Sequence, residues 1–98
     1  MQSKQYYVYI LGNIARTVLY IGVTDNLIKR VWQHKNDVAK GFTQKYKVHD
    51  LLFYEVYDHP TSAIEREKQI KSWKRGAKEK LIMNINPGLV DLYNQIIK

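Results

Sequence analysis

Residues 6–11 and 18–23 each alternate between two kinds of side chain, one aliphatic and the other mostly tyrosine. A period of two residues is typical of a β-strand whose two faces have different surroundings. Residues 12–17 join the two segments and fit a hairpin loop. We therefore predict a β-hairpin with an aliphatic face packed beneath helices and a tyrosine face. The aliphatic face comprises Val8, Ile10, Leu19, Ile21 and Val23, and the tyrosine face comprises Tyr7, Tyr9, Tyr20 and Gly22.

The pattern after the hairpin changes to helical spacing. Thr24 or Asp25 is predicted to cap a helix, and apolar residues at positions 27, 28 and 31 form a stripe that runs to about residue 36. Residues 37–49 show no clear period, and a loop of that length is often a binding element. Residues 51–57 predict a third strand.

Further helical segments are predicted after the third strand. The first has Ser62 and Glu65 at the spacing of a capping box and ends at Gly76. Residues 77–84 predict a short helix, and residues 89–97 predict a last amphipathic turn or two. The predicted fold class is α/β of the α+β type. It is a small three-stranded antiparallel sheet flanked by helices, in the order β-β-α-β-α-α-α.

The composition is that of one small basic domain. The chain has 98 residues, and we predict a single domain over residues 1–98. Its 16 Lys and Arg outnumber its 9 Asp and Glu, which gives a formal net charge of +7. This balance favours a polyanionic partner, most often nucleic acid, although charge alone does not exclude a basic protein without one. The basic residues concentrate in residues 28–47 and 65–80, which either line one groove or form two separate solvated faces.

The lack of cysteine and of long apolar runs bears on where the protein works. Without cysteine, disulfides and thiolate metal sites are excluded, and a reducing, cytoplasmic location is expected. No apolar run approaches the ~20 residues of a membrane helix. The first residues also lack the apolar core of a signal peptide. We therefore expect no membrane partner.

Glu67 is the sharpest single candidate for chemistry. It falls among Ala63, Ile64 and Ile70, which are predicted to define the apolar face of their helix. A carboxylate on such a face has to be paired, hydrated in a cleft or bound to a metal, because burying it alone is costly. A structural salt bridge and a functional role are both consistent with this position.

Arg30, His34 and the tyrosines are weaker candidates when each is taken alone. Arg30 and His34 are four residues apart, so they share one side of their helix beside its apolar stripe. A guanidinium suits a phosphate and an imidazole relays a proton, but an ordinary surface pair has the same spacing. Tyr9 and Tyr20 suit either an aromatic core or a platform where hydroxyls meet a water or a phosphate.

Taken together, these residues resemble the GIY-YIG nuclease family. Tyr7-Val8-Tyr9 resembles the first half-motif, with Tyr7 in place of its leading glycine, and Tyr20-Ile21-Gly22 matches the second. Arg30 and His34 resemble the family's Arg-x-x-x-His, and residues 63–67 resemble its Ala-x-x-x-Glu helix. The stretches GFTQKY, EREKQIKSWKR and NPGLVDLY are similar to the small stand-alone branch of the family.

The resemblance implies a divalent-metal-dependent endonuclease, a hydrolase that cleaves phosphodiester bonds in nucleic acid, with DNA favoured over RNA. It implies one Mg²⁺ or Mn²⁺ ion held by Glu67. Tyr9 would orient or deprotonate the attacking water, and it would need activation by the cation, by Arg30 or by Tyr20. Arg30 would stabilise the developing phosphate charge.

Three further residues complete the implied site. His34 would assist through a hydrogen bond, and Tyr20 would hold phosphate or water. The family also uses a late asparagine, which falls at Asn86 in this sequence, or else at Asn94.

Nucleic acid is the partner expected from this resemblance and from the charge. The lysines expected to contact it are Lys29, Lys35, Lys40, Lys45, Lys68 and Lys71. Since the chain has no extra domain to choose a substrate, a targeting protein partner fits. The alternatives are a non-catalytic nucleic-acid-binding module on the same scaffold and a protein-interaction domain. The carboxylate of Glu67 favours the nuclease, because it would repel a phosphate unless a cation intervened.

Overall fold

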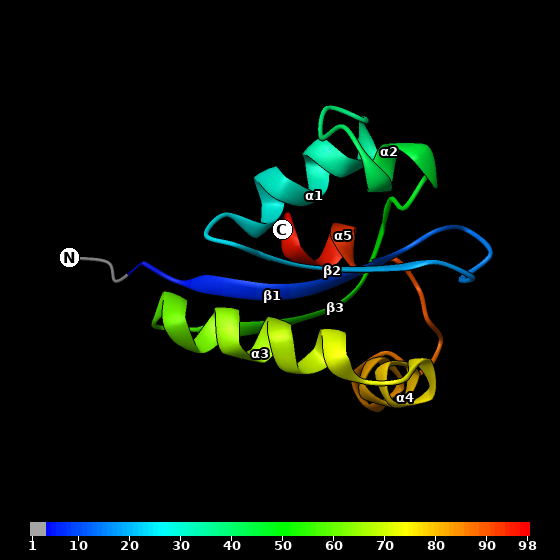
Figure 1. Cartoon of the computed structure of the whole chain (residues 1–98). Coiled ribbons are helices and arrows are strands. Elements are labelled where there is room, and N and C mark those ends of the chain that lie inside the picture. Colours follow the sequence, from blue (N-terminus) through cyan, green and yellow to red (C-terminus); the bar gives the residue numbers. More distant parts are fainter. Residues whose placement is uncertain (1–3) are drawn as a thin grey trace.

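The computed structural model describes residues 4–98, which form a three-stranded sheet and five helices (Figure 1). The elements are β1 (Tyr6–Gly12), β2 (Leu19–Thr24), α1 (Leu27–Lys35), α2 (Phe42–Lys45), β3 (Asp50–Tyr57), α3 (Pro60–Ser72), α4 (Arg75–Ile85) and α5 (Tyr93–Ile96). The strands are antiparallel and lie in the order β2-β1-β3. The predicted fold class is confirmed, and the predicted order gains one short helix, α2, inside residues 37–49.

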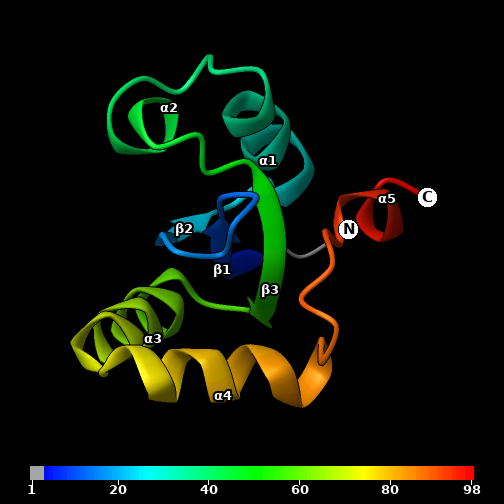
Figure 2. The same ribbon diagram turned by 90° about the vertical axis from the view of Figure 1, so that its right-hand side faces the viewer.

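The sheet is the middle layer, with helices on both faces. Figures 1 and 2 show α1 and α2 on one side and α3 and α4 on the other. On the aliphatic face, the core consists of Val8, Ile10, Ile21, Leu52, Phe53, Ala63, Ile70 and Ile82. On the tyrosine face, it consists of Tyr9, Leu11, Leu27, Val31, Val48, Leu51 and Leu92. The two chemically distinct faces predicted for the hairpin are therefore confirmed.

A break in register lets two consecutive residues of β3 join the same core. Ile10 lies opposite Phe53 while Leu11 lies opposite Leu51, so Leu52 is an extra residue in β3. Such a bulge bends and twists a strand. Leu52 and Phe53 consequently both join the aliphatic core, and Leu51 joins the tyrosine core.

The helix starts differ from those predicted. Asn26 caps α1, because its side-chain oxygen accepts a hydrogen bond from the backbone N–H of Lys29 at 3.1 Å. Thr24 instead accepts from the backbone N–H of Asn26 at 3.1 Å. Helix α3 begins at Pro60, a residue preorganised for a first helical position, so Ser62 lies inside its first turn and the predicted capping box is wrong.

The junction between α3 and α4 also lies elsewhere than predicted. Helix α3 ends at Ser72 and α4 begins at Arg75, so Gly76 lies in the first turn of α4 and does not end the preceding helix. Trp73 marks the break. Its backbone is extended, its ring packs against the aliphatic core, and the guanidinium of Arg66 lies 5.1 Å from the ring centre.

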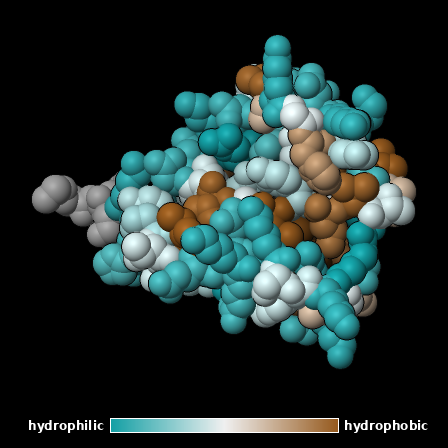
Figure 3. All heavy atoms as spheres, viewed as in Figure 1, coloured by the Kyte–Doolittle hydropathy of each residue, from teal (hydrophilic) through white to brown (hydrophobic). Residues whose placement is uncertain are grey.

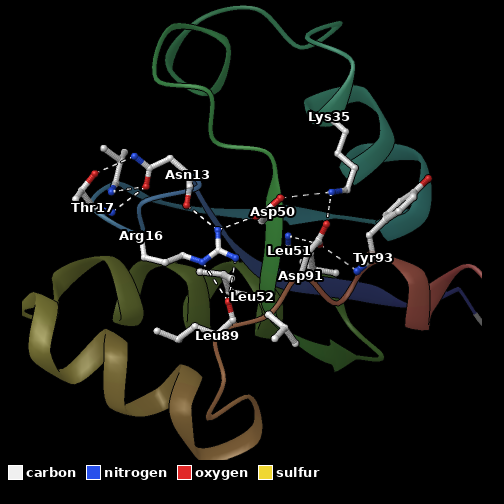
Figure 4. A network of polar contacts seen from close by, with 12 residues as sticks. Asn13, Arg16, Thr17, Lys35, Asp50, Leu51, Leu52, Leu89, Asp91 and Tyr93 are labelled. Atoms are coloured by element: carbon white, nitrogen blue, oxygen red, sulfur yellow. Dashed lines mark hydrogen bonds and ion pairs between the residues drawn. The ribbon is translucent and has the colours of Figure 1, made fainter.

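An ionic network ties the C-terminal segment to the rest of the fold (Figure 4). Arg16, in the hairpin loop, donates to Asp50 at 2.7 Å and to the carbonyl of Leu89 at 2.9 and 3.1 Å. Lys35 of α1 pairs with Asp91 and lies 3.7 Å from Asp50. The network thus joins the hairpin loop, α1, β3 and the segment before α5.

Within residues 4–98, no helix is long and apolar enough to cross a membrane.

Candidate active site

The candidate site is built around the side chain of Tyr9, which extends from β1 towards β2, an edge strand of the sheet. Tyr9 lies opposite Gly22, and a Cβ at Gly22 would stand 2.5 Å from the Tyr9 hydroxyl oxygen. Glycine is therefore required at this position, since any other side chain would displace the phenol. Gly22 thus makes room for the side chain of Tyr9.

The Tyr9 hydroxyl belongs to a chain of buried polar groups. It lies 3.3 Å from His34 Nε2, and His34 Nδ1 lies 2.8 Å from Thr43 Oγ1. The three residues come from β1, α1 and α2, and each is at most 4% exposed. Because buried polar atoms are costly unless hydrogen-bonded, this chain fixes the orientation of the imidazole.

A strip of aromatic rings leads from this chain to the surface. The Tyr20 ring lies 6.3 Å from Tyr9 and 5.5 Å from His34, measured between ring centres. It is followed by Phe42 at 6.1 Å and then Tyr46, 4.8 Å from Phe42. Phe42 and Tyr46 are 46% and 44% exposed. We call Tyr20, Phe42 and Tyr46 the aromatic strip.

Charged residues on both faces of the sheet affect the pKa of Tyr9. Burial, acting together with neighbouring Tyr20, raises the pKa of the Tyr9 hydroxyl. The positive charge of Arg30 acts in the opposite direction, and the negative charge of Glu67 adds to the rise in pKa. Arg30 comes from α1 and Glu67 from α3, so helices on opposite faces present opposite charges to one hydroxyl. Because Tyr20 raises this pKa, the activation that Tyr9 would need is expected from Arg30 or from a cation and not from Tyr20.

His34 is held in its neutral form at pH 7. Burial, with the charge of Arg30 and a smaller effect of His49, lowers the pKa of His34 to about 4. A neutral imidazole donates one hydrogen bond and accepts one, which matches its two partners, Tyr9 and Thr43.

Glu67 lies at the border of the packed face of α3. Its side chain is 19% exposed, and Lys71 of the same helix lies 3.0 Å from its carboxylate. The packed face is narrower than predicted, since Ala63 and Ile70 are fully buried while Ile64 is 42% exposed. Within residues 4–98, Glu67 is therefore not an isolated buried charge, and its ion pair is made within its own helix.

The residues present fit a single divalent ion held by few protein groups. Within residues 4–98, no three His, Asp, Glu or Cys side chains gather in a cluster that could hold a metal ion. Glu67 offers one partly exposed carboxylate near the Tyr9 hydroxyl. A hard cation such as Mg²⁺ keeps several waters and takes one or two carboxylates, so this donor set is adequate.

Two of the predicted residues lie away from the cleft. Asn86, at the end of α4, is 3% exposed, and its side chain makes three bonds to backbone: to Leu52, and twice to Val90. It therefore anchors a turn at β3, on the opposite edge of the sheet from β2. Lys35 is engaged in the ionic network. The alternative, Asn94, is exposed on α5.

The other predicted lysines are exposed. Lys29 lines a shallow pocket with Arg30, and the Lys45 ammonium lies 5.4 Å from the Tyr46 ring centre. Lys40 and Lys68 are exposed, and Lys71 pairs with Glu67. Figure 3 views the β2 side of the molecule, where hydrophilic residues cover the upper and lower helices and hydrophobic ones gather across the middle.

Thr43, Phe42 and Tyr46 are the site residues that sequence patterns did not reveal. They lie in or next to α2, within a stretch that showed no period. The sequence hint of a functional segment lay in its composition, because two aromatic residues and two lysines accompany Thr43 within residues 42–47.

Fold and site together define a small α+β domain with two tyrosines and a histidine gathered at a sheet edge. A family model for the GIY-YIG catalytic domain matches residues 5–80. The chain belongs to the GIY-YIG family, whose members are nucleases that generally use divalent metal ions.

Relatives of similar size support this assignment. A UPF0213 protein of Natronomonas pharaonis is 35% identical over 80 residues, which cover 82% of this chain and 93% of that protein. A UPF0213 protein of Pediococcus pentosaceus is 31% identical over 87 residues, covering 89% and 90%. The solution structure of a UPF0213 protein from Bacillus halodurans is similar in fold, with a TM-score of 0.54 and 23% identity, over 84% of this chain and 86% of that one.

Proposed function

We propose that this chain is a divalent-metal-dependent endonuclease that hydrolyses phosphodiester bonds, in DNA rather than RNA. The observation that carries the proposal is the buried Tyr9 hydroxyl, 3.3 Å from His34 Nε2, in a chain that matches the GIY-YIG catalytic domain. The charges of Arg30 and Glu67 act on the pKa of the same hydroxyl. A guanidinium can stabilise the phosphate charge, a carboxylate can hold a metal ion and a hydroxyl can orient water, and here these groups come from three separate elements.

Arg30 has the role of binding the scissile phosphate. Its planar group donates to two oxygens at once, which a lysine cannot reproduce. Its exposure on α1 leaves the guanidinium accessible to a substrate, and its charge opposes the rise in the Tyr9 pKa. Arg30 therefore acts on both the phosphate and Tyr9.

Tyr9 has the role of orienting the attacking water and accepting its proton, and His34 supports Tyr9 through their hydrogen bond. Tyr20, half-buried beside both, has the role of holding water or a phosphate oxygen. Glu67 would hold Mg²⁺ or Mn²⁺, which when bound neutralises charge on the phosphate and the leaving oxygen. Lys71 would then be released from its pair with Glu67.

The surroundings of the cleft suit a nucleic acid. Lys29, Lys40, Lys45 and Lys68 offer positive charge to a phosphate backbone. The exposed rings of Phe42 and Tyr46 offer faces on which bases stack, an interaction worth about 1–3 kcal/mol per base.

We also propose that the chain acts as one domain, because Leu92, beyond the matched family region, is buried in the tyrosine core. A separate protein would supply targeting.

The test is a cleavage assay with labelled single-stranded, duplex and branched DNA and RNA, with Mg²⁺, with Mn²⁺ and with a chelator. We expect cleavage of DNA that requires the metal and is lost in Glu67→Ala. Glu79→Ala is the matched control, because Glu79 also pairs with a basic residue four positions away on its own helix. Cleavage that survives chelation, or a Glu67→Ala variant that cuts at the parent rate, contradicts the proposal.

The second candidate is a binding module that holds nucleic acid without cutting it. The Lys71–Glu67 pair favours it, because the lysine neutralises the carboxylate without any metal. Tight binding to DNA at low salt, with no cleavage of any substrate under either metal, would identify this function.

A further inference from the structure

Thr43 is a buried polar residue to which the proposed reaction assigns no role. It lies in α2, is 3% exposed, and its hydroxyl oxygen is 2.8 Å from His34 Nδ1. A buried hydroxyl in a four-residue helix is costly unless its hydrogen bond is made. The position of Thr43 is therefore tied to the imidazole.

The local backbone holds Thr43 in place. Gly41 precedes α2 with a φ of 110°, in the region that favours glycine, and lets the chain turn sharply into the helix. The backbone N–H of Val48 donates to the carbonyl of Thr43 at 2.9 Å, and Val48 itself is fully buried. Helix α2 is thus anchored at both ends, and the hydroxyl has little freedom to move away from His34.

Two arrangements of protons satisfy the contacts of a neutral His34. In the first, Nδ1–H donates to Thr43 and Nε2 accepts the proton of Tyr9. In the second, the Thr43 hydroxyl donates to Nδ1, and Nε2–H donates to the Tyr9 oxygen. Among the residues that the structure describes, Nδ1 is the partner found for the Thr43 hydroxyl, so only the second arrangement gives that hydroxyl an acceptor for its proton. The Tyr9 proton then has a different acceptor, the neighbouring Tyr20 hydroxyl, whose hydrogen bond with Tyr9 adds to the rise in the Tyr9 pKa.

We propose that Thr43 is a positioning residue that fixes the His34 tautomer, so that the imidazole carries its proton on Nε2 and donates it to the Tyr9 oxygen. This inference rests on the proposed function in one respect, the catalytic role of Tyr9. The chemical consequence concerns the phenolate. When Tyr9 loses its proton to a water in the cleft, the negative oxygen keeps a neutral hydrogen-bond donor in place.

The charges around the pair support this arrangement. The groups that face Tyr9 and His34 are Tyr20 from β2, Arg30 from α1, Glu67 from α3 and His49 from the segment before β3. Arg30 disfavours a protonated His34 and favours a deprotonated Tyr9. A fixed neutral donor therefore suits this pair better than a charged imidazolium.

The first measurement uses the unmodified protein and needs no activity. Long-range ¹H–¹⁵N correlation spectra distinguish a protonated ring nitrogen from a bare one. We expect the proton of His34 on Nε2 and a bare Nδ1 at pH 7. A proton on Nδ1, or an even mixture of the two tautomers, overturns the proposal.

The second measurement compares Thr43→Val with Thr43→Ser. Valine keeps the shape without the donor, so the His34 proton should redistribute between the two nitrogens. If the protein cuts DNA, kcat should then fall by about tenfold, the size of one hydrogen bond, with KM unchanged. Serine should restore both.

Thr17→Val removes a hydroxyl in the hairpin loop and is the matched control. Retention of the Nε2 proton in Thr43→Val overturns the positioning role. Because the spectra are independent of cleavage, an inactive parent protein would count against the proposed function and leave the tautomer test valid.

Discussion

The hydroxyl of Tyr9 is subject to neighbours that act on its proton in opposite directions. Burial, Tyr20 and Glu67 favour the protonated form, and Arg30 favours the phenolate. To act as a base, Tyr9 therefore needs a positive charge that offsets the carboxylate of Glu67. It also needs the hydrogen bond from His34. The reactivity of this residue is decided by four side chains from three other elements, and none of them adjoins it in the sequence.

Gly22→Ala should damage both stability and activity. The added Cβ would stand 2.5 Å from the Tyr9 hydroxyl oxygen and would push the phenol out of its place. Overpacking of this kind costs about 1–3 kcal/mol of unfolding free energy, and displacement of the phenol should abolish cleavage. Denaturant unfolding and a cleavage assay measure the two effects.

Gly76→Ala is the control for that substitution. Nothing lies within 4 Å of the added Cβ, and Gly76 lies in the first turn of α4. Alanine there should raise the free energy of unfolding by about 0.5–1 kcal/mol. Equal effects of the two substitutions would show that the contact between Tyr9 and Gly22 is unimportant.

His34 should make stability fall with acidification over a defined range. Its pKa is about 4 in the folded protein and near the ordinary 6.5 when unfolded, so between these values the unfolded chain binds more protons. The contribution is present in full above pH 6.5 and is lost as the pH falls to about 4. At 1.36 kcal/mol per pKa unit, it amounts to roughly 3 kcal/mol.

Unfolding curves between pH 4 and 7 check this expectation. His34→Gln should flatten the pH dependence of the unfolding free energy. His59→Gln, a change at an exposed histidine, corrects for the loss of one imidazole. An unchanged slope in His34→Gln would rule out His34 as the source.

At the scale of elements, sequence patterns anticipate the structure where a periodic face packs against a core. The hairpin faces were predictable because their period is two, and α1 because its apolar stripe is regular. Helix α2 was not, since it depends on the distant bond from Thr43 to His34 and on the backbone of Gly41.

Polar residues were the other source of error at this scale. Asn86 and Lys35 have side chains that suit a catalytic cleft, but their contacts are made with segments remote in the sequence. Asn86 bonds to the backbone of Leu52, and Lys35 pairs with Asp50 and Asp91. Residue type alone does not reveal which polar side chains the fold uses for its own stability.

Two isoleucines of α3 allow a test of how this helix packs against the sheet. Ile70 is fully buried and Ile64 is 42% exposed on the same helix. Ile70→Ala should cost about 2–5 kcal/mol, because it leaves a cavity in the aliphatic core. Ile64→Ala should cost much less. Thermal or denaturant unfolding of both variants is the measurement, and equal losses would contradict the packing described for α3.

At the scale of the whole molecule, basic residues come from the helices on both faces of the sheet. Arg30, Lys29 and Lys45 come from the helices on the tyrosine face, and Lys68 comes from α3 on the other face. A polyanion lying along the β2 edge would meet both groups. The two basic segments of the sequence are thus compatible with a single groove, one of the two arrangements left open by the sequence.

Binding to duplex DNA should weaken steeply with salt. The formal net charge of +7 and the exposed lysines predict release of bound counterions, with a log–log slope of about −0.9 for each phosphate contacted. Lys45→Ala should make the slope shallower by about one such unit. Fluorescence anisotropy in the presence of a chelator measures binding without cleavage. A slope near zero would mean that the basic surface does not contact the phosphates.

The C-terminal segment covers a strand edge at which copies of the molecule could otherwise pair. Leu92 donates to the carbonyl of Leu51 at 2.7 Å, and Asn86 donates to that of Leu52, so the outer edge of β3 is covered where the strand begins. An uncovered strand edge is a template for pairing with another chain. Residues 86–92 should therefore reduce aggregation through this edge of the sheet. A chain that ends at residue 85 keeps α4 and the buried Ile82 but loses residues 86–92. It should form larger assemblies on size-exclusion chromatography, and a monomeric profile would refute this.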